Sequence, residues 1–273
     1  DKNKHKEWAV ICGCICIIIA PWHLTMPLKQ AKISVLDVGQ GLAVFIKTKS
    51  HSLLYDAGAK FSSGFDLGQA VVAPYLMHQG ITSLNALVIS HEDLDHRGGY
   101  QTLKNKFNIK NTYRSGKKGF KNCHNAKGWS WDGVNFYFLR LSKVKNSSKN
   151  DNSCVLVIEN EWQRLILPGD IEKHTEMNLV DKYKDLLKTT VLISPHHGSK
   201  TSSSNIFLKA TKPAYVFISA GKNNRYKLPH SSIIKRYKSL GINYFNTANC
   251  GMITWQLTNR LKIDQPTTFL DPC

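Results

Sequence analysis

Acidic residues are scarce in this 273-residue sequence: 19 Asp and Glu stand against 37 Lys and Arg, which gives a formal net charge of +18. Such an excess favours polyanionic partners, nucleic acid or anionic lipid, and says nothing about the fold. Composition leaves one alternative open, an ordinary soluble protein that is rich in lysine. Hydrophobic residues make up 42% and charged residues 21% of the chain, and these ordinary values exclude a disordered tail and a collagen-like fibre.

A Cys-x-x-Cys zinc pair is also absent. Three of the seven cysteines lie in an apolar run near the start of the sequence, and the other four are scattered: Cys123, Cys154, Cys250 and Cys273. This spacing does not resemble a disulfide framework. One bridge, for example Cys123–Cys250, is compatible with a domain that lies outside the cytoplasm.

Only one apolar run approaches the length of a membrane helix, from Trp8 to Ala20, and it follows the lysine-rich residues 1–7. Because spanning a bilayer takes roughly 20 apolar residues, the run fits a signal-peptide core, or the end of a membrane helix that residues 21–28 extend. We expect the membrane helix, since no small-x-small cleavage site follows; a buried core helix is the third reading. The lysine-rich flank then lies in the cytoplasm and everything after Leu28 outside it. We expect a membrane-helix end and linker at residues 1–28 and a separate hydrolase domain at 29–273.

Short apolar runs, rich in β-branched and aromatic residues, alternate with helix-like stretches after residue 32. Strands are expected at residues 32–38, 42–48, 52–58, 84–90, 131–141, 154–159, 162–167, 189–194 and 214–220, and helices at 67–78, 98–107, 172–187, 205–211 and 231–240. Residues 110–127 are basic and rich in Gly and Asn, which predicts a long exposed loop. Two strand-rich halves flanked by helices predict an α/β protein, a four-layer αββα sandwich, although an open doubly wound sheet has the same periodicity.

The clearest chemical signal is the stretch SHEDLDHRGG at residues 90–99, directly after an apolar strand. Within six residues it holds four side chains of metal-ligand type: His91, Asp93, Asp95 and His96. A loop that leaves a strand can turn them toward one point, and Gly98-Gly99 allows a sharp turn into the next helix. This density of ligand types predicts a metal site, with Glu92 and Leu94 pointing away from it.

This stretch resembles the first metal motif, H-x-H-x-D-H, of the metallo-β-lactamase superfamily, and its surroundings resemble the C-terminal domain of ComEC-type DNA-internalisation proteins. Further segments match in order over about residues 32–256: LDVGQG at 36–41, LYDAG at 54–58, ILPGD at 166–170, PHHGS at 195–199 and PH at 229–230. The resemblance implies the metallo-β-lactamase fold for this domain. It also implies that the apolar run is the end of the last membrane helix of such a protein.

The resemblance further implies two bound metal ions. The ligands that the resemblance implies are His91, Asp93, Asp95 and His96, with Asp170 as the carboxylate that bridges the two ions. Of the pair His196 and His197, one is implied to be a further ligand and the other to face the phosphate. Which of the two histidines binds metal stays open. The order of strands along the chain supports a shared site, because Asp170 and His196 both follow strands that can end at one sheet edge. For Asp170 alone, a helix N-cap is the competing reading.

Three departures from the superfamily pattern bear on the metal. Asp93 stands where many members have His, Leu42 stands where many have Asp, and between His96 and Asp170 there is no obvious third-motif histidine except His124, in the basic stretch. Asn152-Ser153 occupy the place that the ComEC-type pattern gives to Asn/Ser. Fewer imidazoles make the site harder, so we expect Mn²⁺, with Zn²⁺ and Mg²⁺ as alternatives. Asp37 and Asp56 are expected to support the ligands or to stabilise turns rather than bind metal.

Two metal ions would activate a water and neutralise a phosphodiester, the arrangement of many nucleases. Asp95, Asp170 and His197 are the expected catalytic residues. The expected substrate-binding residues are Ser199, Lys200, Thr201, Ser202, His230, Asn152 and Ser153; an exposed loop with a helix cap is the other reading of the serine run. Cations expected to hold DNA are Lys104, Lys106, Lys110, Arg114, Lys117, Lys118, Lys121, Lys127, Lys200, Lys222, Arg225 and Lys227. Aromatic residues placed to stack on bases are Tyr113, Phe120, Trp129, Trp131 and Tyr226, each also a candidate for packing.

These features lead to three functional hypotheses. The first is a metal-dependent nuclease domain of a DNA-uptake membrane protein, located on the periplasmic or extracellular side of the cytoplasmic membrane, which degrades the strand that is not imported. Its partners would be DNA, the membrane and other DNA-uptake proteins. The second is a small-substrate phosphodiesterase or lactonase of the same fold. The third is a catalytically silent module that guides DNA.

Overall fold

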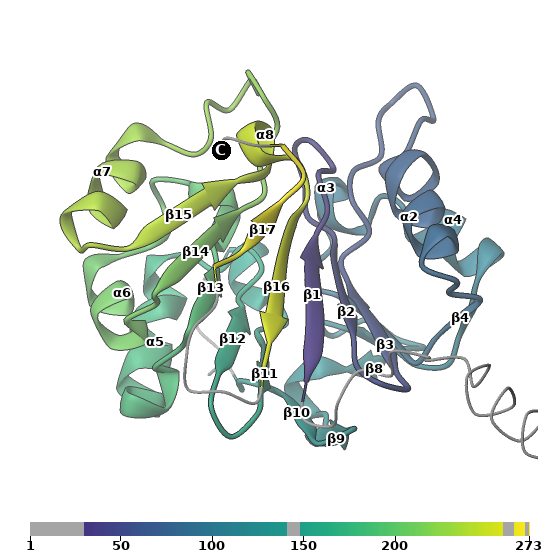
Figure 1. Cartoon of the computed structure of the whole chain (residues 1–273), viewed down its shortest axis with the longest axis horizontal. Coiled ribbons are helices and arrows are strands. Elements are labelled where there is room, and N and C mark those ends of the chain that lie inside the picture. Colours follow the sequence, from purple (N-terminus) through teal and green to yellow (C-terminus); the bar gives the residue numbers. More distant parts are fainter. Residues whose placement is uncertain (1–29, 141–147, 259–264, 271–272) are drawn as a thin grey trace, which may run out of the picture.

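The computed structural model describes residues 30–140, 148–258, 265–270 and 273 (Figure 1). The expected membrane-helix end and linker at residues 1–28 lie outside the described residues. Within the described residues, none of the helices combines the length and the apolar character needed to cross a bilayer.

Two mixed β-sheets form the centre of the molecule (Figure 1). The first contains, in spatial order, β17 (Thr267–Thr268), β16 (Ile253–Leu257), β1 (Ala31–Val35), β2 (Val44–Lys47), β3 (Ser52–Tyr55), β5 (Ala86–Ile89), β7 (Thr112–Arg114) and β8 (Lys121–Asn122). The second contains β15 (Asn243–Asn246), β14 (Tyr215–Ile218), β13 (Val191–Ile193), β12 (Arg164–Leu167), β11 (Leu156–Glu159), β10 (Val134–Phe138) and β9 (Trp129–Trp131). A small pair joins β4 (Ser83–Leu84) to β6 (Asn108–Ile109).

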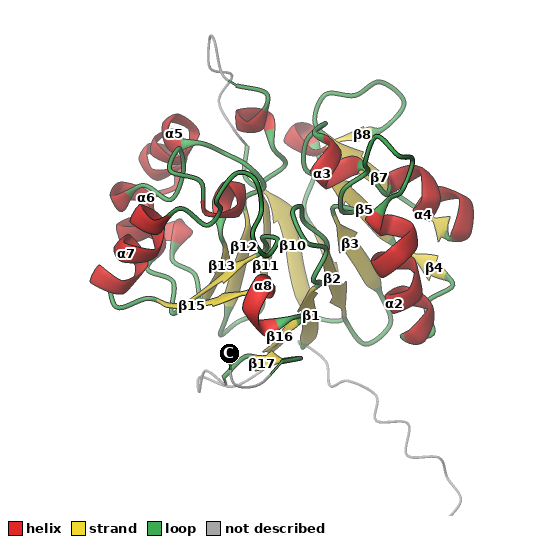
Figure 2. Ribbon diagram, turned by 90° about the horizontal axis from the view of Figure 1, so that it is seen from above, coloured by secondary structure: helices red, strands yellow, loops and turns green. Residues whose placement is uncertain are grey.

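Helices cover the outer face of each sheet, so the molecule has four layers (Figure 2). On the first sheet lie the π-helical turn η1 (Gly68–Val72), α2 (Ala73–His78) and α4 (Tyr100–Lys106), and on the second α5 (Lys173–Tyr183), α6 (Asn205–Thr211) and α7 (Ser231–Ser239). Short helical turns are α3 (Leu94–Arg97), η2 (Cys123–Asn125), η3 (Asn150–Asn152), η4 (Lys184–Leu187), η5 (Pro195–Gly198) and α8 (Thr247–Cys250). The expected αββα sandwich is therefore formed.

Strand periodicity explains the layers. On β2, Val44 and Ile46 belong to the core between the sheets, whereas Phe45 packs toward the helices of the first sheet. Both faces of the central strands are buried, which is why their sequences are continuous apolar runs rather than alternating ones. The expected hairpin is also present, with β11 antiparallel to β12, and from β12 to β15 the neighbours are parallel.

Gly98 and Gly99 were expected to allow a sharp turn into the next helix, but the structure shows a different requirement for glycine at these positions. Gly98 has helical backbone angles, φ −53° and ψ −46°, so it does not make a turn that only glycine allows. A Cβ on Gly98 would lie 2.1 Å from the backbone nitrogen of Lys60, and one on Gly99 would lie 2.3 Å from the carbonyl oxygen of Ala57. The pair is needed because the helix start packs directly against the loop after β3.

Residues 110–127 do not form one long loop as expected. They contain β7 and β8, which extend the first sheet, and the turn η2. The Cys123–Cys250 bridge is not formed either: Cys123 is bonded to Cys154, with their Cα atoms 5.8 Å apart, and Cys250 to Cys273. The reason is that β8 brings Cys123 beside the start of β11, whereas Cys250 ends α8 near the C-terminal segment.

Candidate metal centre

The candidate ligands follow the strands of the two sheets at one edge of the sandwich. Ser90 and His91 come directly after β5 of the first sheet, Asp170 follows β12, and His196 and His197 follow β13 of the second sheet. The carboxyl ends of parallel strands are the usual place for a site in α/β proteins. Because both sheets present such ends at the same edge, residues more than 100 positions apart meet there.

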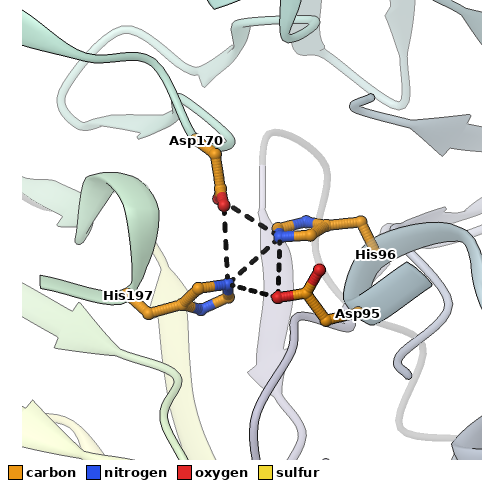
Figure 3. Close-up of side chains that lie close together, drawn as sticks. All are labelled: Asp95, His96, Asp170 and His197. Carbon is orange, nitrogen blue, oxygen red and sulfur yellow. Dashed lines mark hydrogen bonds and ion pairs between the residues drawn. The ribbon is translucent and has the colours of Figure 1, made fainter. Parts of the chain in front are cut away.

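Four of these side chains converge closely (Figure 3). Donor atoms of Asp95, His96, Asp170 and His197 all lie within 4.8 Å of one another. His96 Nε2 is 3.2 Å from Asp170 Oδ1, and His197 Nε2 is 3.4 Å from Asp95 Oδ2. Two imidazoles and two carboxylates around one point form a donor set that suits Zn²⁺ or Mn²⁺. We call this group the second metal position.

The other nitrogen of each imidazole is engaged, which fixes the ring. His96 Nδ1 lies 2.8 Å from Asp56 Oδ2, and His197 Nδ1 lies 2.8 Å from the carbonyl oxygen of Ser219. Asp56 in turn accepts hydrogen bonds from the N–H and the hydroxyl of Ser90, both at 2.7 Å. A carboxylate or carbonyl that holds Nδ1–H leaves Nε2 free for a metal, as in many metal sites.

The charges of this group shift its proton equilibria. Burial by itself lowers the pKa of His96, but the carboxylates of Asp170 and Asp56 outweigh it and raise that pKa well above its usual value. For His197 the same balance of burial against Asp170 and Asp95 also raises the pKa. Burial opposes ionisation of Asp170, yet His96 and His197 hold the pKa of Asp170 well below its usual value. A bound cation has to displace the histidine protons, so metal affinity rises with pH.

A second group of donors adjoins the first. His91 Nε2 is 3.7 Å from Asp93 Oδ2 and 3.8 Å from Asp170 Oδ2. Burial, together with the charge of His96, lowers the pKa of His91 and so favours its neutral imidazole. Its Nε2 is buried and makes no hydrogen bond, and a metal ion is the partner that such an atom fits. We call this group the first metal position; Asp170 belongs to both positions.

The two adjacent histidines of the PHHGS segment differ in their surroundings. Both adopt positive φ, 50° at His196 and 54° at His197, a conformation that costs a non-glycine residue about 1 kcal/mol or more. His197 is 3% exposed and points into the second metal position. His196 is less buried; its Nε2 lies 3.8 Å from Asp170 Oδ2 and its Nδ1 3.2 Å from the hydroxyl of Thr201. The geometry favours His197 as the ligand.

The expected substrate-binding residues separate into two sets. Ser199, Lys200 and His230 line a cavity beside the second metal position, and Asn152 lines another cavity beside His91. Thr201 contacts His196 instead of lining either cavity.

The structure does not bring Ser202 or Ser153 to a substrate surface. Ser202 is fully buried and its hydroxyl donates to the carbonyl of Ile171. Ser153 is fully buried as well; its hydroxyl accepts the N–H of Asp170 at 3.0 Å and donates to the carbonyl of Asn150. Ser153 therefore helps to position Asp170.

Several residues expected to contact DNA are used for packing. Arg114 is buried and forms a two-point contact with Glu92, with distances of 3.0 and 2.7 Å. Tyr113 and Trp129 stack on each other at 5.3 Å and pack against the core between the sheets. Tyr226 differs from them, because it is 55% exposed at the rim of the cavity that holds His230.

Sequence reasoning missed the supporting groups Ser90 and Ser219. Ser90 belongs to the quoted motif, so its position directly before the first ligand was an available signal. Ser219 contributes a backbone carbonyl, which carries no signal in the sequence.

The comparisons with known proteins agree with this geometry. The family model of the metallo-beta-lactamase superfamily matches residues 36–222. Curated relatives include "Competence protein ComA" of Neisseria gonorrhoeae, 35% identical over 92% of this chain and 36% of that protein, and "Recombination protein 2" of Haemophilus influenzae, 32% identical over 97% of this chain and 34% of that protein. "ComE operon protein 3" of Bacillus subtilis is 28% identical over 96% of this chain and 38% of its own length. The chain thus spans about a third of the length of these relatives, and the resemblance to a ComEC-type domain is confirmed.

Solved structures show the same fold at low sequence identity. The metallo-beta-lactamase fold protein YhfI from Bacillus subtilis has a TM-score of 0.57 and 12% identity, covering 84% of this chain and 99% of that one. A metallo hydrolase from the archaeon Ignicoccus hospitalis has a TM-score of 0.53 and 12% identity, covering 83% and 98%. The four-layer fold, the two donor groups and the family match lead to one conclusion: the chain belongs to the metallo-beta-lactamase superfamily.

Proposed function

We propose that this domain is a nuclease that hydrolyses DNA phosphodiester bonds with two divalent metal ions. The observation that carries the proposal is the position of Asp170, whose two carboxylate oxygens face the donors of both metal positions: Oδ1 lies 3.2 Å from His96, and Oδ2 lies 3.8 Å from His91 and 3.7 Å from His197. A carboxylate so placed could serve two cations, and two such cations would stabilise both the attacking and the leaving oxygen of a phosphodiester. The donors of both positions are present, which argues against a catalytically silent module.

The chain's own residues have separate tasks in this proposal. Bound metal ions would supply an activated water and charge neutralisation on the phosphate. Asp95, with a side chain that is 32% exposed, is the carboxylate of the second metal position that can accept the proton of the water. His196 and Lys200 line the adjoining cavity, where they can hold a phosphate oxygen. His197 stays a ligand because its ring is buried and held by Ser219.

The donor types favour Mn²⁺, with Zn²⁺ and Mg²⁺ as alternatives. The second metal position offers two imidazoles and two carboxylates, and the first offers one imidazole and two carboxylates. Carboxylate-rich positions suit harder cations than the three-histidine positions of typical zinc sites. We expect Mn²⁺ to support the highest activity.

We further propose that the domain serves DNA uptake at the cytoplasmic membrane, on its periplasmic or extracellular side, and degrades the strand that is not imported. The relatives include a competence protein and a recombination protein, and these names support a role with DNA. The net charge of +18 supports a polyanionic substrate. The bridges Cys123–Cys154 and Cys250–Cys273 support an oxidising compartment.

The test uses the full chain in detergent with end-labelled single- and double-stranded DNA and with Mn²⁺, Mg²⁺ or Zn²⁺. Degradation that EDTA and Asp170→Asn both abolish is expected, while Asp181→Asn, at an exposed position on α5, keeps the wild-type rate. Salt-sensitive DNA binding without cleavage would overturn the nuclease proposal in favour of a guiding module. Hydrolysis of small soluble esters alone would favour a phosphodiesterase or lactonase.

A further inference from the structure

Two cavities adjoin the metal centre and share one wall residue. The first has a volume of about 1040 Å³ and is bounded at the centre by His91 and Asp93; the second, about 480 Å³, is bounded there by Asp95, Asp170 and the histidine pair. Asp93 lines both. Pockets for one drug-sized molecule measure roughly 300–1,000 Å³, so the second suits one such group and the first is at the upper end of that range. A substrate that fills both has to cross the metal centre.

The first cavity has the charge of a phosphate-binding channel. Five cationic side chains line it: Arg97, Lys117, Arg140, Lys149 and Lys182. Three acidic residues line it as well: Asp93, which belongs to the first metal position, Asp151 and Glu92. Glu92 is shared among three cations, since it contacts the buried Arg114 at 2.7 Å and lies 3.7 and 3.8 Å from Arg97 and Lys117. The positive excess that remains fits successive phosphates of a nucleic-acid strand.

Asp151, another acidic residue of the first cavity, is already engaged. Its carboxylate accepts the N–H of Glu172 at 2.9 Å and the hydroxyl of Ser148 at 3.2 Å. These donors offset part of the negative charge that Asp151 would present to a phosphate.

The second cavity presents an aromatic ring instead. Tyr226 lines it and is 55% exposed, with the guanidinium of Arg225 over the ring at 4.6 Å from its centre. Asn224 braces this loop: its side-chain amide donates to the carbonyl of Gly221 at 2.9 Å and accepts the N–H of Leu228 at 3.0 Å. An exposed, braced aromatic ring is a surface on which an unpaired nucleobase stacks.

We infer that a single DNA strand crosses the metal centre, with successive phosphates along the first cavity, the phosphate at the metal centre beside His196 and Lys200, and one unpaired base against Tyr226 in the second cavity. This inference rests on the proposed nuclease function and specifies its substrate: bonds inside a single strand are cut as well as bonds near its ends. In each cut the oxygen of a water forms a bond to phosphorus and one ester P–O bond breaks. The departing sugar oxygen takes up a proton, and nothing is oxidised or reduced. In a duplex the neighbouring base pairs cover the faces of each base, so little base surface is free for Tyr226 and duplex DNA is the poorer substrate.

The test compares a closed circular single strand with the linear strand of the same sequence and with its duplex, using the full chain and Mn²⁺. We expect the circle to be cut at a rate within a few-fold of the linear strand, and the duplex more slowly. Tyr226→Ala is expected to raise KM for a single-stranded oligonucleotide about tenfold, and Tyr226→Phe to restore most of the affinity. Hydrolysis of bis(p-nitrophenyl) phosphate, which is too short to occupy both cavities, should change far less. Lys209→Gln, at an exposed position on α6 outside both cavities, is the control and keeps the wild-type KM.

The possible outcomes distinguish the crossing path, the base site and the nuclease function itself. Degradation of the linear strand with an intact circle would overturn the crossing path. Cutting of the circle with an unchanged KM for Tyr226→Ala would overturn the base site. Hydrolysis of bis(p-nitrophenyl) phosphate with no cleavage of any DNA would instead contradict the proposed nuclease function, and so would the absence of all hydrolysis.

Discussion

His96 Nε2 and His197 Nε2 lie 3.1 Å apart, although 101 residues separate the two histidines and they belong to different halves of the sandwich. Each ring is held from its other side, His96 by Asp56 and His197 by the carbonyl of Ser219. The two free nitrogens therefore face the same small volume, together with the carboxylates of Asp95 and Asp170. One shared cation could bind both nitrogens at once. Histidines at separate surface positions would not be held in this arrangement.

This geometry predicts unequal roles for the adjacent histidines. His197→Ala removes a donor of the second metal position and is expected to lower Mn²⁺ affinity about 100-fold or more, as measured by calorimetric titration. His196→Ala should lower it less than tenfold, because His196 is not among the four residues whose donor atoms converge at this position, and its Nδ1 lies 3.2 Å from the hydroxyl of Thr201. His78→Ala, at an exposed position on α2, serves as the control. Equal losses for His196 and His197 would contradict this assignment.

Asp56 is expected to control metal affinity without touching the metal. Its carboxylate accepts three hydrogen bonds, two from Ser90 and one from His96. Asp56→Asn offers a single acceptor oxygen, so the ring of His96 loses its support and Mn²⁺ affinity should fall about 10- to 100-fold. Asn tolerates the positive φ of this position, 61°. Asp37→Asn is the matched control, since Asp37 is exposed and its side chain accepts only the N–H of Gly39. An unchanged Mn²⁺ affinity in Asp56→Asn would contradict the supporting role of Asp56.

Much of the fold was predictable because its signals are local. Strands buried on both faces appear as continuous apolar runs, and the ligands of residues 91–96 follow one of them. The remaining features depend on contacts between distant segments. For the serine run that includes Ser202 and Ser203, the sequence allowed either a phosphate-binding segment or an exposed loop. Both serines are instead fully buried, because Glu176 of α5 accepts the N–H of Ser203 and Tyr237 of α7 contacts its hydroxyl. No pattern within the serine run reveals those partners.

The same limit applies to the cysteines. Their pairing depends on β8 joining the edge of the first sheet, which sequence periodicity did not show. Arg114 likewise read as a DNA contact, and its burial beside Glu92 follows from its place at the end of β7.

The Cys123–Cys154 bridge is expected to stabilise both the fold and the first metal position. It closes a loop with a sequence separation of 31, which in the chain-entropy account stabilises by about 3–4 kcal/mol. Cys154 also follows Ser153, which positions Asp170, and its own N–H donates to the carbonyl of Ser90 at 2.9 Å.

A double Cys123→Ala/Cys154→Ala variant should therefore lose roughly 10 °C in Tm. The difference in affinity between its first and second Mn²⁺ equivalents should be larger than in the wild-type protein. The variant Cys250→Ala/Cys273→Ala, which opens a loop with a separation of 23, is the control: its Tm falls while its metal affinities stay unchanged. Equal changes in metal affinity in the two double variants would contradict the positional role of the first bridge.

The lowered pKa of Asp132 is expected to make part of the folding stability depend on pH. Burial opposes ionisation of Asp132, but hydrogen bonds from the hydroxyl of Thr48 at 2.6 Å, the N–H of Ser50 at 2.8 Å and the ring of His51 lower its pKa to about 2, from an ordinary 3.8. Since the folded-state pKa is depressed, the stabilisation is present above pH 3.8 and is lost as the pH falls through about 2. Asp132→Asn should lower Tm by a few degrees at pH 6 and progressively less below pH 4, as followed by circular dichroism. An equal loss of Tm at pH 6 and near pH 2, with Asp181→Asn unchanged at both, would show that the charge of Asp132 contributes nothing.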